Sequence, residues 1–129
     1  MIVVDCSAVV DALSLVEGTD DLRSRLRNED LHAPGLLDVE VVSALRGLTL
    51  GGRLTPSRVQ DLLTDFDDLA LERWAAGDAL RRRAFALRDN LTAYDATYVA
   101  LAEALDCPLV TRDQRLARAR GHGAQIEVI

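Results

Sequence analysis

Short apolar runs alternate with amphipathic stretches along the chain, and the two patterns predict different elements. Residues 2–4 and 107–111 are largely apolar without alternation, which is typical of strands buried on both faces. Weaker strand patterns occur at 30–33, 69–71 and 126–128. Between these segments, apolar residues recur every three or four positions, the period of a helix. Strands that alternate with helices form a parallel sheet covered on both faces. We therefore predict an α/β domain with three layers, α/β/α, and a short, mostly parallel central sheet.

Capping residues define where the predicted helices begin. Ser7, Thr19 and Thr92 are N-cap residues that stand just before helical periods. Thr55 precedes Pro56, and a proline suits the first turn of a helix. The predicted helices are residues 7–16, a segment after Thr19, 36–50, a segment after Thr55, 77–87, 93–105 and 113–120.

The composition fits one domain and excludes several mechanisms. A chain of 129 residues, 49% of them hydrophobic, suffices for one core, so we expect a single domain over 1–129. The 15 basic residues are all arginine, which excludes lysine Schiff bases and Walker-type phosphate clamps. The formal net charge of −6 argues at first sight against nucleic-acid binding.

The cysteines and the apolar runs indicate a compartment. No apolar stretch approaches the roughly 20 residues of a membrane span, and the first residues do not have the pattern of a signal peptide. Cys6 and Cys107 are too few for a disulfide scaffold, and they fall at opposite sheet edges, beyond disulfide reach. We therefore expect a cytoplasmic protein with reduced cysteines and no membrane partner.

Four acids stand on otherwise apolar elements. Asp5 ends the first predicted strand, and Asp113 follows a later one. Ligand sites of open parallel sheets form outside the C-terminal ends of strands, so these two acids are predicted to share a crevice. Glu40 interrupts an apolar helix start, and Asp95 lies in the first turn of a helix of small residues. Acids this close to a core are costly unless they are paired or bound to a cation.

Each acid also has a purely structural interpretation. Asp95 follows Thr92 at the spacing of a capping box, and Asp113 can cap the helix behind it. Asp5 can close a strand-to-helix turn, and Glu40 can face solvent. A single metal site, however, explains all four together. Oxygen-only ligands suit Mg²⁺ or Mn²⁺ rather than zinc, and two such ions would balance four carboxylates in the arrangement used for phosphodiester hydrolysis.

Several segments are distinctive when taken together. They are residues 2–8 (IVVDCSA), Glu40 in its helix, 91–96 (LTAYDA) and 109–116 (LVTRDQRL). In type, order and spacing they resemble the PIN domain, and more narrowly the VapC-type toxin ribonucleases of bacterial type II toxin–antitoxin pairs. The Tyr-Asp-Ala helix followed by Thr-x-Asp is the most specific part of this likeness, which covers essentially the whole chain.

The resemblance implies a Mg²⁺- or Mn²⁺-dependent endoribonuclease with one or two ions per site. The matching positions are the acidic quartet Asp5, Glu40, Asp95 and Asp113, and the supporting hydroxyls Ser7 and Thr111. The family also implies metal-activated water as nucleophile, RNA as substrate, a cognate antitoxin that inserts into the active-site groove, and a homodimer. Cys6 departs from the pattern, because the family usually has a small residue or threonine there.

Two other functions stay open at this point. A catalytically degenerate PIN-like module would bind RNA or protein with the same fold. A phosphoacceptor receiver domain would share the size, acidity, sheet and Mg²⁺, but such domains pair acids after the first strand and use a lysine, which this chain lacks.

The arginines next to the acids are the candidates for RNA contact. We predict that Arg112 and Arg115 help to hold RNA. Residues 81–83 are three consecutive arginines that either grip phosphate or form a solvated helix face, since they point in three directions. The residues interpreted as structural are His32, His122 and Trp74, the last with a core or dimer role.

Overall fold

A five-stranded sheet forms the centre of the protein, which the computed structural model describes over residues 1–129. The strand order is β3-β2-β1-β4-β5, and every pairing is parallel. This confirms the predicted short parallel sheet. The strands are β1 (Ile2–Val4), β2 (Leu31–Pro34), β3 (Leu71–Trp74), β4 (Leu109–Thr111) and β5 (Ile126–Val128).

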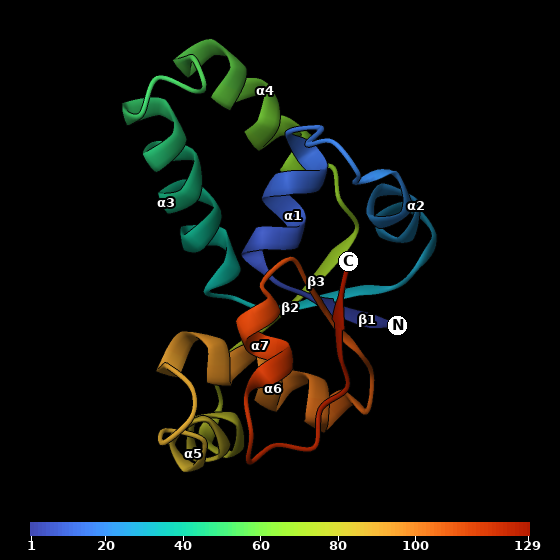
Figure 1. Ribbon diagram of the computed structural model, residues 1–129, viewed down its shortest axis with the longest axis vertical. Coiled ribbons are helices and arrows are strands. Elements are labelled where there is room, and N and C mark those ends of the chain that lie inside the picture. Colours follow the sequence, from blue (N-terminus) through green and yellow to red (C-terminus); the bar gives the residue numbers. More distant parts are fainter.

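Helices cover both faces of this sheet (Figure 1). On one face, α1 contacts α2, α3 and α4; on the other, α6 contacts β1, β2 and β4 and packs against α5. The predicted three-layer α/β/α architecture is therefore confirmed. The helices are α1 (Cys6–Leu13), α2 (Asp20–Asn28), α3 (Leu37–Leu50), α4 (Pro56–Asp67), α5 (Asp78–Ala86), α6 (Ala93–Leu105) and α7 (Gln114–Arg118). No helix is both long and apolar enough to cross a membrane.

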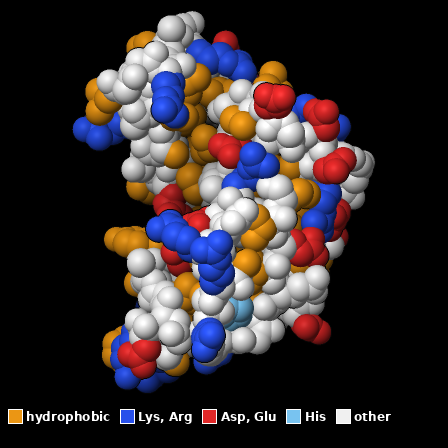
Figure 2. All heavy atoms as spheres, viewed as in Figure 1, with side chains coloured by type: hydrophobic (Ala, Val, Ile, Leu, Met, Phe, Trp, Pro, Cys, Tyr) orange, Lys and Arg blue, Asp and Glu red, His pale blue; other side chains and the backbone are white.

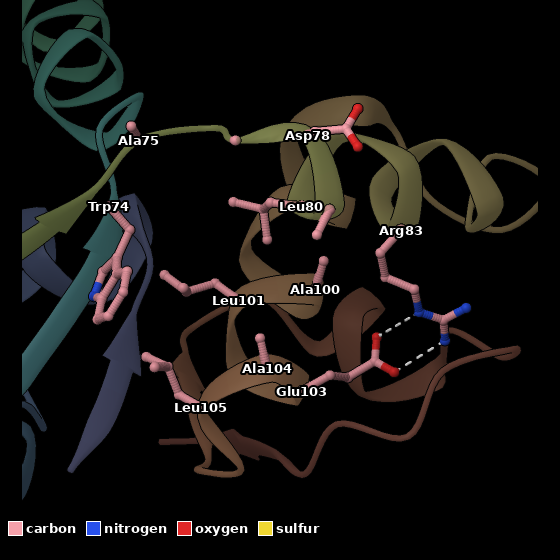
Figure 3. Close-up of a pocket in the computed structure, with 12 residues that line it drawn as sticks. Trp74, Ala75, Asp78, Leu80, Arg83, Ala100, Leu101, Glu103, Ala104 and Leu105 are labelled. Atoms are coloured by element: carbon pink, nitrogen blue, oxygen red, sulfur yellow. Dashed lines mark hydrogen bonds and ion pairs between the residues drawn. The ribbon is translucent and has the colours of Figure 1, made fainter.

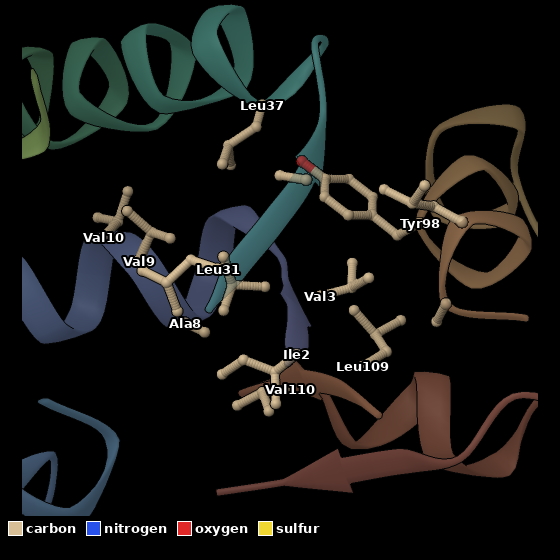
Figure 4. Packing of buried hydrophobic residues seen from close by; sticks show 14 of the residues in the cluster. Ile2, Val3, Ala8, Val9, Val10, Leu31, Leu37, Tyr98, Leu109 and Val110 are labelled. Carbon is tan, nitrogen blue, oxygen red and sulfur yellow. The ribbon is translucent and has the colours of Figure 1, made fainter. Parts of the chain in front are cut away.

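The core lies around β1 and β4, the two central strands (Figure 4). Val3 and Leu109 are fully buried, as are the other two residues of each strand. Because helices cover both faces, neither strand shows a polar alternation, which is why their apolar runs identified them in the sequence. Tyr98 of α6 reaches the same core and is 2% exposed.

Several predicted boundaries are wrong, each for a local reason. The predicted strand at 69–71 lies instead at Leu71–Trp74, because this edge strand is largely exposed and its polar residues hide the strand pattern. Asp5, not Ser7, caps α1, since its carboxylate accepts the Ala8 N–H at 3.0 Å. That helix ends at Leu13, before the predicted residue 16, and α7 spans only Gln114–Arg118.

The histidines and cysteines have structural positions. His32 is 6% exposed, and its Nδ1 accepts the indole N–H of Trp74 at 3.0 Å. The Nδ1 of His122 accepts the backbone N–H of residue 124 at 3.2 Å. Cys6 and Cys107 are both free thiols, as predicted.

Candidate active site

The topology brings the C-terminal ends of β1 and β4 together. These strands are neighbours, yet the chain continues from β1 to β2 on one side and from β4 to β5 on the other. That reversal is the position at which open α/β sheets form ligand crevices. Asp5 follows β1 directly, and Asp113 lies two residues beyond the end of β4. The predicted placement of these two acids at one edge is therefore confirmed.

The carboxylate of Asp5 is buried and held by three donors. It accepts hydrogen bonds from Ser7 Oγ at 2.7 Å, from the Ala8 N–H at 3.0 Å and from the Thr111 hydroxyl. Burial nevertheless raises the pKa of Asp5, and the negative charge of Asp95 adds to that effect. Asp5 thus caps α1 and has its carboxylate fixed in position by three hydrogen bonds.

Two hydroxyls connect this carboxylate to the loop that carries Asp113. Ser7 Oγ and Thr111 Oγ1 lie 3.3 Å apart. Ser7 Oγ accepts the Arg112 N–H, and Thr111 Oγ1 accepts the Asp113 N–H, each at 3.0 Å. Ser7 and Thr111 therefore fix the loop after β4 against the start of α1.

Glu40 enters the crevice from α3 and is held by a residue that the sequence did not single out. The Tyr98 hydroxyl donates to Glu40 Oε1 at 2.6 Å. Burial raises the pKa of Glu40, and the charges of Asp95 and Asp5 raise it further, whereas the bond from Tyr98 lowers it. In the sequence, the only signal for Tyr98 was its position three residues after Asp95, on the same side of α6.

Asp95 lies in the first turn of α6 without being needed to cap it. Thr92 caps this helix by accepting the backbone N–H of Asp95 at 3.2 Å. Burial and the charge of Asp113 raise the pKa of the Asp95 carboxyl; Arg115 and the bond with Thr92 lower it, and the net shift is upward. Capping of α6 requires only the backbone N–H of Asp95, so it does not explain why a carboxylate is present at a place that disfavours its charge.

Asp113 differs from the other three acids because it has an internal cation. Its carboxylate caps α7 by accepting the Arg115 N–H at 2.9 Å. The Arg115 guanidinium also donates to it, at 2.7 Å from Nη2 and 3.1 Å from Nε. These contacts with Arg115 hold the pKa of Asp113 below its usual value. The structural interpretation of Asp113 as a cap is therefore correct, and it leaves the carboxylate at the crevice.

The four acids form a linked electrostatic group rather than a closed cage. Asp5, Glu40 and Asp95 repel one another, and Asp95 also repels Asp113. In this conformation, no three His, Cys, Asp or Glu side chains lie close enough together to coordinate one metal ion. Figure 2 shows acidic atoms in a hollow between the α3 side and the α5–α6 side of the molecule. An oxygen-only set with excess negative charge fits Mg²⁺ or Mn²⁺ in donor chemistry.

The two arginines beside Asp113 differ in the exposure of their side chains and in the number of their partners. The Arg112 side chain donates to Asp11 Oδ2 at 3.1 Å and to the Ile129 carbonyl at 2.7 Å, and it is 25% exposed. It therefore ties the end of β4 to α1 and to the C-terminus. The Arg115 side chain is 85% exposed and has only Asp113 as a partner. RNA contact by either residue stays a prediction, and Arg115 is the freer of the two.

The arginine run on α5 does not act as a unit. Arg82 pairs with Asp78 at 3.0 Å, and Arg83 pairs with Glu103 at 2.9 Å, while Arg81 turns back to a backbone carbonyl. Arg81 also lies 4.0 Å from Asp78, so Arg81 and Arg82 share an acid of their own helix, whereas Arg83 pairs with α6. This division agrees with the solvated-face interpretation.

Figure 3 shows a large cavity on the α5–α6 side of the molecule. It has a volume of about 650 Å³ and is mostly apolar, between the start of α5 and the second half of α6. Trp74, Leu80, Leu101 and Leu105 line it, and the Arg83–Glu103 ion pair lies at one side. None of the four acids lines this cavity, so its size does not mark the site of the chemistry.

Comparisons with known proteins identify the family of this chain. The PIN domain family matches residues 2–122. Ribonuclease VapC12 of Mycobacterium tuberculosis is 38% identical over 129 residues, which cover 100% of this chain and 99% of that protein. Ribonuclease VapC9 of the same species is 45% identical over 117 residues, covering 91% and 89%.

The fold is also shared with solved structures. VapBC2 from Rickettsia felis, bound to a DNA fragment from its promoter, matches with a TM-score of 0.69 and 17% identity. The match covers 99% of this chain and 98% of that one. The chain therefore belongs to the PIN domain family. Its identity to full-length relatives places it, within that family, among the VapC proteins.

Proposed function

We propose that this protein is a Mg²⁺- or Mn²⁺-dependent endoribonuclease, the toxin of a toxin–antitoxin pair. The observation that carries the proposal is the group of four carboxylates at the open ends of β1 and β4, three of which have a raised pKa. Such a group is unfavourable until cations join it. The VapC relatives are named ribonucleases, which supports the reaction class.

The residues of this site would have different roles in the reaction. Asp5, Glu40, Asp95 and Asp113 are the proposed metal ligands and catalytic residues. A bound Mg²⁺ or Mn²⁺ would supply Lewis acidity at the scissile phosphate and a lowered pKa for the attacking water. Ser7 and Thr111 hold the Asp5 carboxylate and the β4 loop in place. Tyr98 fixes Glu40 by its hydrogen bond of 2.6 Å.

The proposal includes the partners that membership among the VapC proteins implies. These are an RNA substrate, a cognate antitoxin that enters the crevice, and a second copy of the chain in a homodimer. It also places the protein in the cytoplasm. The family membership removes the phosphoacceptor receiver domain as an alternative, whereas a PIN-like binding module without catalysis is separated from the proposal by experiment.

The test is cleavage of a panel of structured RNAs with Mg²⁺ or Mn²⁺, in the presence and absence of EDTA. Asp5→Asn and Asp95→Asn should each remove cleavage, because each loses a negatively charged ligand. Asp61→Asn is the matched control, since Asp61 is an exposed acid on α4, outside the crevice.

Three results would contradict the proposal. Cleavage that survives EDTA would show that no divalent cation is needed. Cleavage that survives both asparagine substitutions would show that the acids are not the site. RNA binding by the wild type without any cleavage would favour the degenerate binding module instead.

A further inference from the structure

A shallow basic hollow adjoins the acids beside α7. It has a volume of about 330 Å³, and it is lined by Asn90, Arg115, Arg118, Ala119 and Arg120. Arg115 also contacts Asp113, so the hollow borders the carboxylate crevice directly. Figure 2 shows arginine side chains gathered on the α7 face, next to the acidic atoms. We call this feature the arginine hollow.

Two arginines of this hollow carry charge that the protein does not neutralise. Arg118 and Arg120 are exposed, and neither takes part in any ion pair of the structure. Arg83 and Arg112, in contrast, are paired with Glu103 and Asp11. Of the arginines that line the hollow or contact the adjoining loop, Arg118 and Arg120 are therefore the two without an ion-pair partner.

The loop after α7, which carries Arg120, is anchored. Arg83 Nη2 donates to the Gly121 carbonyl at 3.4 Å, and the Glu103 carboxylate accepts the Gly123 N–H at 3.4 Å. Gly121 has a φ of +87°, and a Cβ there would lie 2.9 Å from Asn90 Nδ2. The glycine thus lets the loop approach Asn90 closely and brings this amide to the edge of the hollow.

From this arrangement we infer that the arginine hollow binds a phosphodiester of the RNA strand, next to the one that is cut. The inference rests on the proposed ribonuclease function. RNA that enters an acidic crevice on a chain of net charge −6 meets repulsion unless positive charge lies beside its path. Arg118 and Arg120 supply that charge, the Asn90 amide adds a donor, and Arg115 stands between the hollow and Asp113. Phosphate contacts of this kind position a strand without reading its sequence.

The test compares two double variants that lose the same charge. Arg118→Gln with Arg120→Gln removes the two charges of the hollow that have no ion-pair partner. Arg27→Gln with Arg53→Gln removes two exposed, unpaired arginines elsewhere on the chain. Binding of fluorescent random-sequence single-stranded RNA is measured by anisotropy over a range of salt, with Ca²⁺ in place of Mn²⁺ so that the RNA stays intact. Cleavage is measured separately with Mn²⁺.

The hollow variant should bind RNA about tenfold more weakly than the control variant, since it loses charge-assisted hydrogen bonds. Its plot of log affinity against log salt should flatten by roughly 0.7 for each phosphate no longer neutralised. If the two variants have equal affinities and slopes while the wild type still cleaves RNA, the hollow does not bind an RNA phosphodiester. The proposed ribonuclease function would be unaffected by that result. No RNA binding or cleavage by the wild type would overturn both.

A free anion is distinguished by a separate arm with inorganic phosphate as competitor. If the hollow binds a phosphodiester of the strand, single uncharged methylphosphonate linkages should weaken wild-type binding at one position and leave the hollow variant unaffected there. Phosphate competition that disappears in the hollow variant, without any loss of RNA affinity, would assign the hollow to a free anion and contradict the inference.

Discussion

Replacement of Asp95 by asparagine should stabilise the metal-free protein while it removes RNA cleavage. The cap of α6 uses the backbone N–H of Asp95, at 3.2 Å from Thr92 Oγ1, and asparagine keeps that bond. Asparagine also keeps the shape of the side chain and can still accept from the Thr92 hydroxyl. What it removes is a charge that burial and Asp113 disfavour, as the raised pKa of Asp95 indicates.

The size of this gain follows from the charges around Asp95. Two unit charges a few ångströms apart interact by about 1 kcal/mol in water and about 4 kcal/mol near a protein surface. Arg115 offsets part of the repulsion, so we expect a gain of about 1 kcal/mol. For a domain of this size, that is a rise in Tm of about 3–5 °C.

The pH dependence has a definite sign. Because the pKa of Asp95 is higher in the folded than in the unfolded state, its charged form lowers the free energy of unfolding at neutral pH. This cost is relieved as the pH falls through the folded-state pKa, and it is gone below the ordinary value of 3.8. The advantage of Asp95→Asn over the wild type should therefore be full at neutral pH and absent in strong acid.

The assay is thermal unfolding at low ionic strength, first in EDTA and then with increasing Mn²⁺. A divalent cation that binds only the folded state stabilises it by about 2.7 kcal/mol at one hundred times its Kd. The wild type should gain this and the variant should gain less, so the order of the two Tm values should reverse. Asp61→Asn should follow the wild type in both conditions. A variant less stable than the wild type in EDTA at neutral pH would refute the reasoning.

Three further changes test neighbouring contacts by the same unfolding and Mn²⁺ titrations. Tyr98→Phe keeps the buried ring but leaves the Glu40 carboxylate without its donor, and it should cost about 1–2 kcal/mol and weaken Mn²⁺ binding. Asp5→Ala removes the cap of α1 and the acceptor of two hydroxyls, so a loss of about 1–3 kcal/mol should outweigh the relief of a buried charge. Gly121→Ala should cost about 1–2 kcal/mol, since its φ of +87° and the nearby Asn90 both disfavour a Cβ. Equal stability of any of these variants and the wild type would contradict the contact concerned.

The sequence predicted those parts of the fold in which burial or helix capping restricts the type of residue. Strands β1 and β4 are buried on both faces, so their apolar runs were visible. Helix α6 was placed at its observed bounds, 93–105, because Thr92 caps it as expected. The edge strand β3 was misplaced, since a mostly exposed strand has little apolar pattern. Local signals thus sufficed where burial was strong.

In the candidate site, too, the features with a local sequence signal could be predicted and those formed by distant residues could not. Asp5 and Asp113 could be assigned to one edge from strand ends and the rule for parallel sheets alone. The bond from Tyr98 to Glu40 joins residues far apart in the chain, and the position of Tyr98 three residues after Asp95 does not reveal this partner. The pairing of Arg115 with Asp113 was not predicted either, because both residues had been assigned separate partners, RNA and metal.

That pairing shows how an acidic protein can admit both a cation and RNA. In the structure, three acids have raised pKa values, and only Asp113 forms an ion pair, with an arginine whose side chain is 85% exposed. Exposed ion pairs contribute only about 0–1 kcal/mol, so Arg115 can leave Asp113 at little cost. When it does, the carboxylate becomes available to a divalent cation. The guanidinium of Arg115, which lines the arginine hollow together with Arg118 and Arg120, would then add uncompensated positive charge there for a phosphate. Occupation of the acids by cations and binding of RNA in the hollow should therefore reinforce each other, despite the net charge of −6.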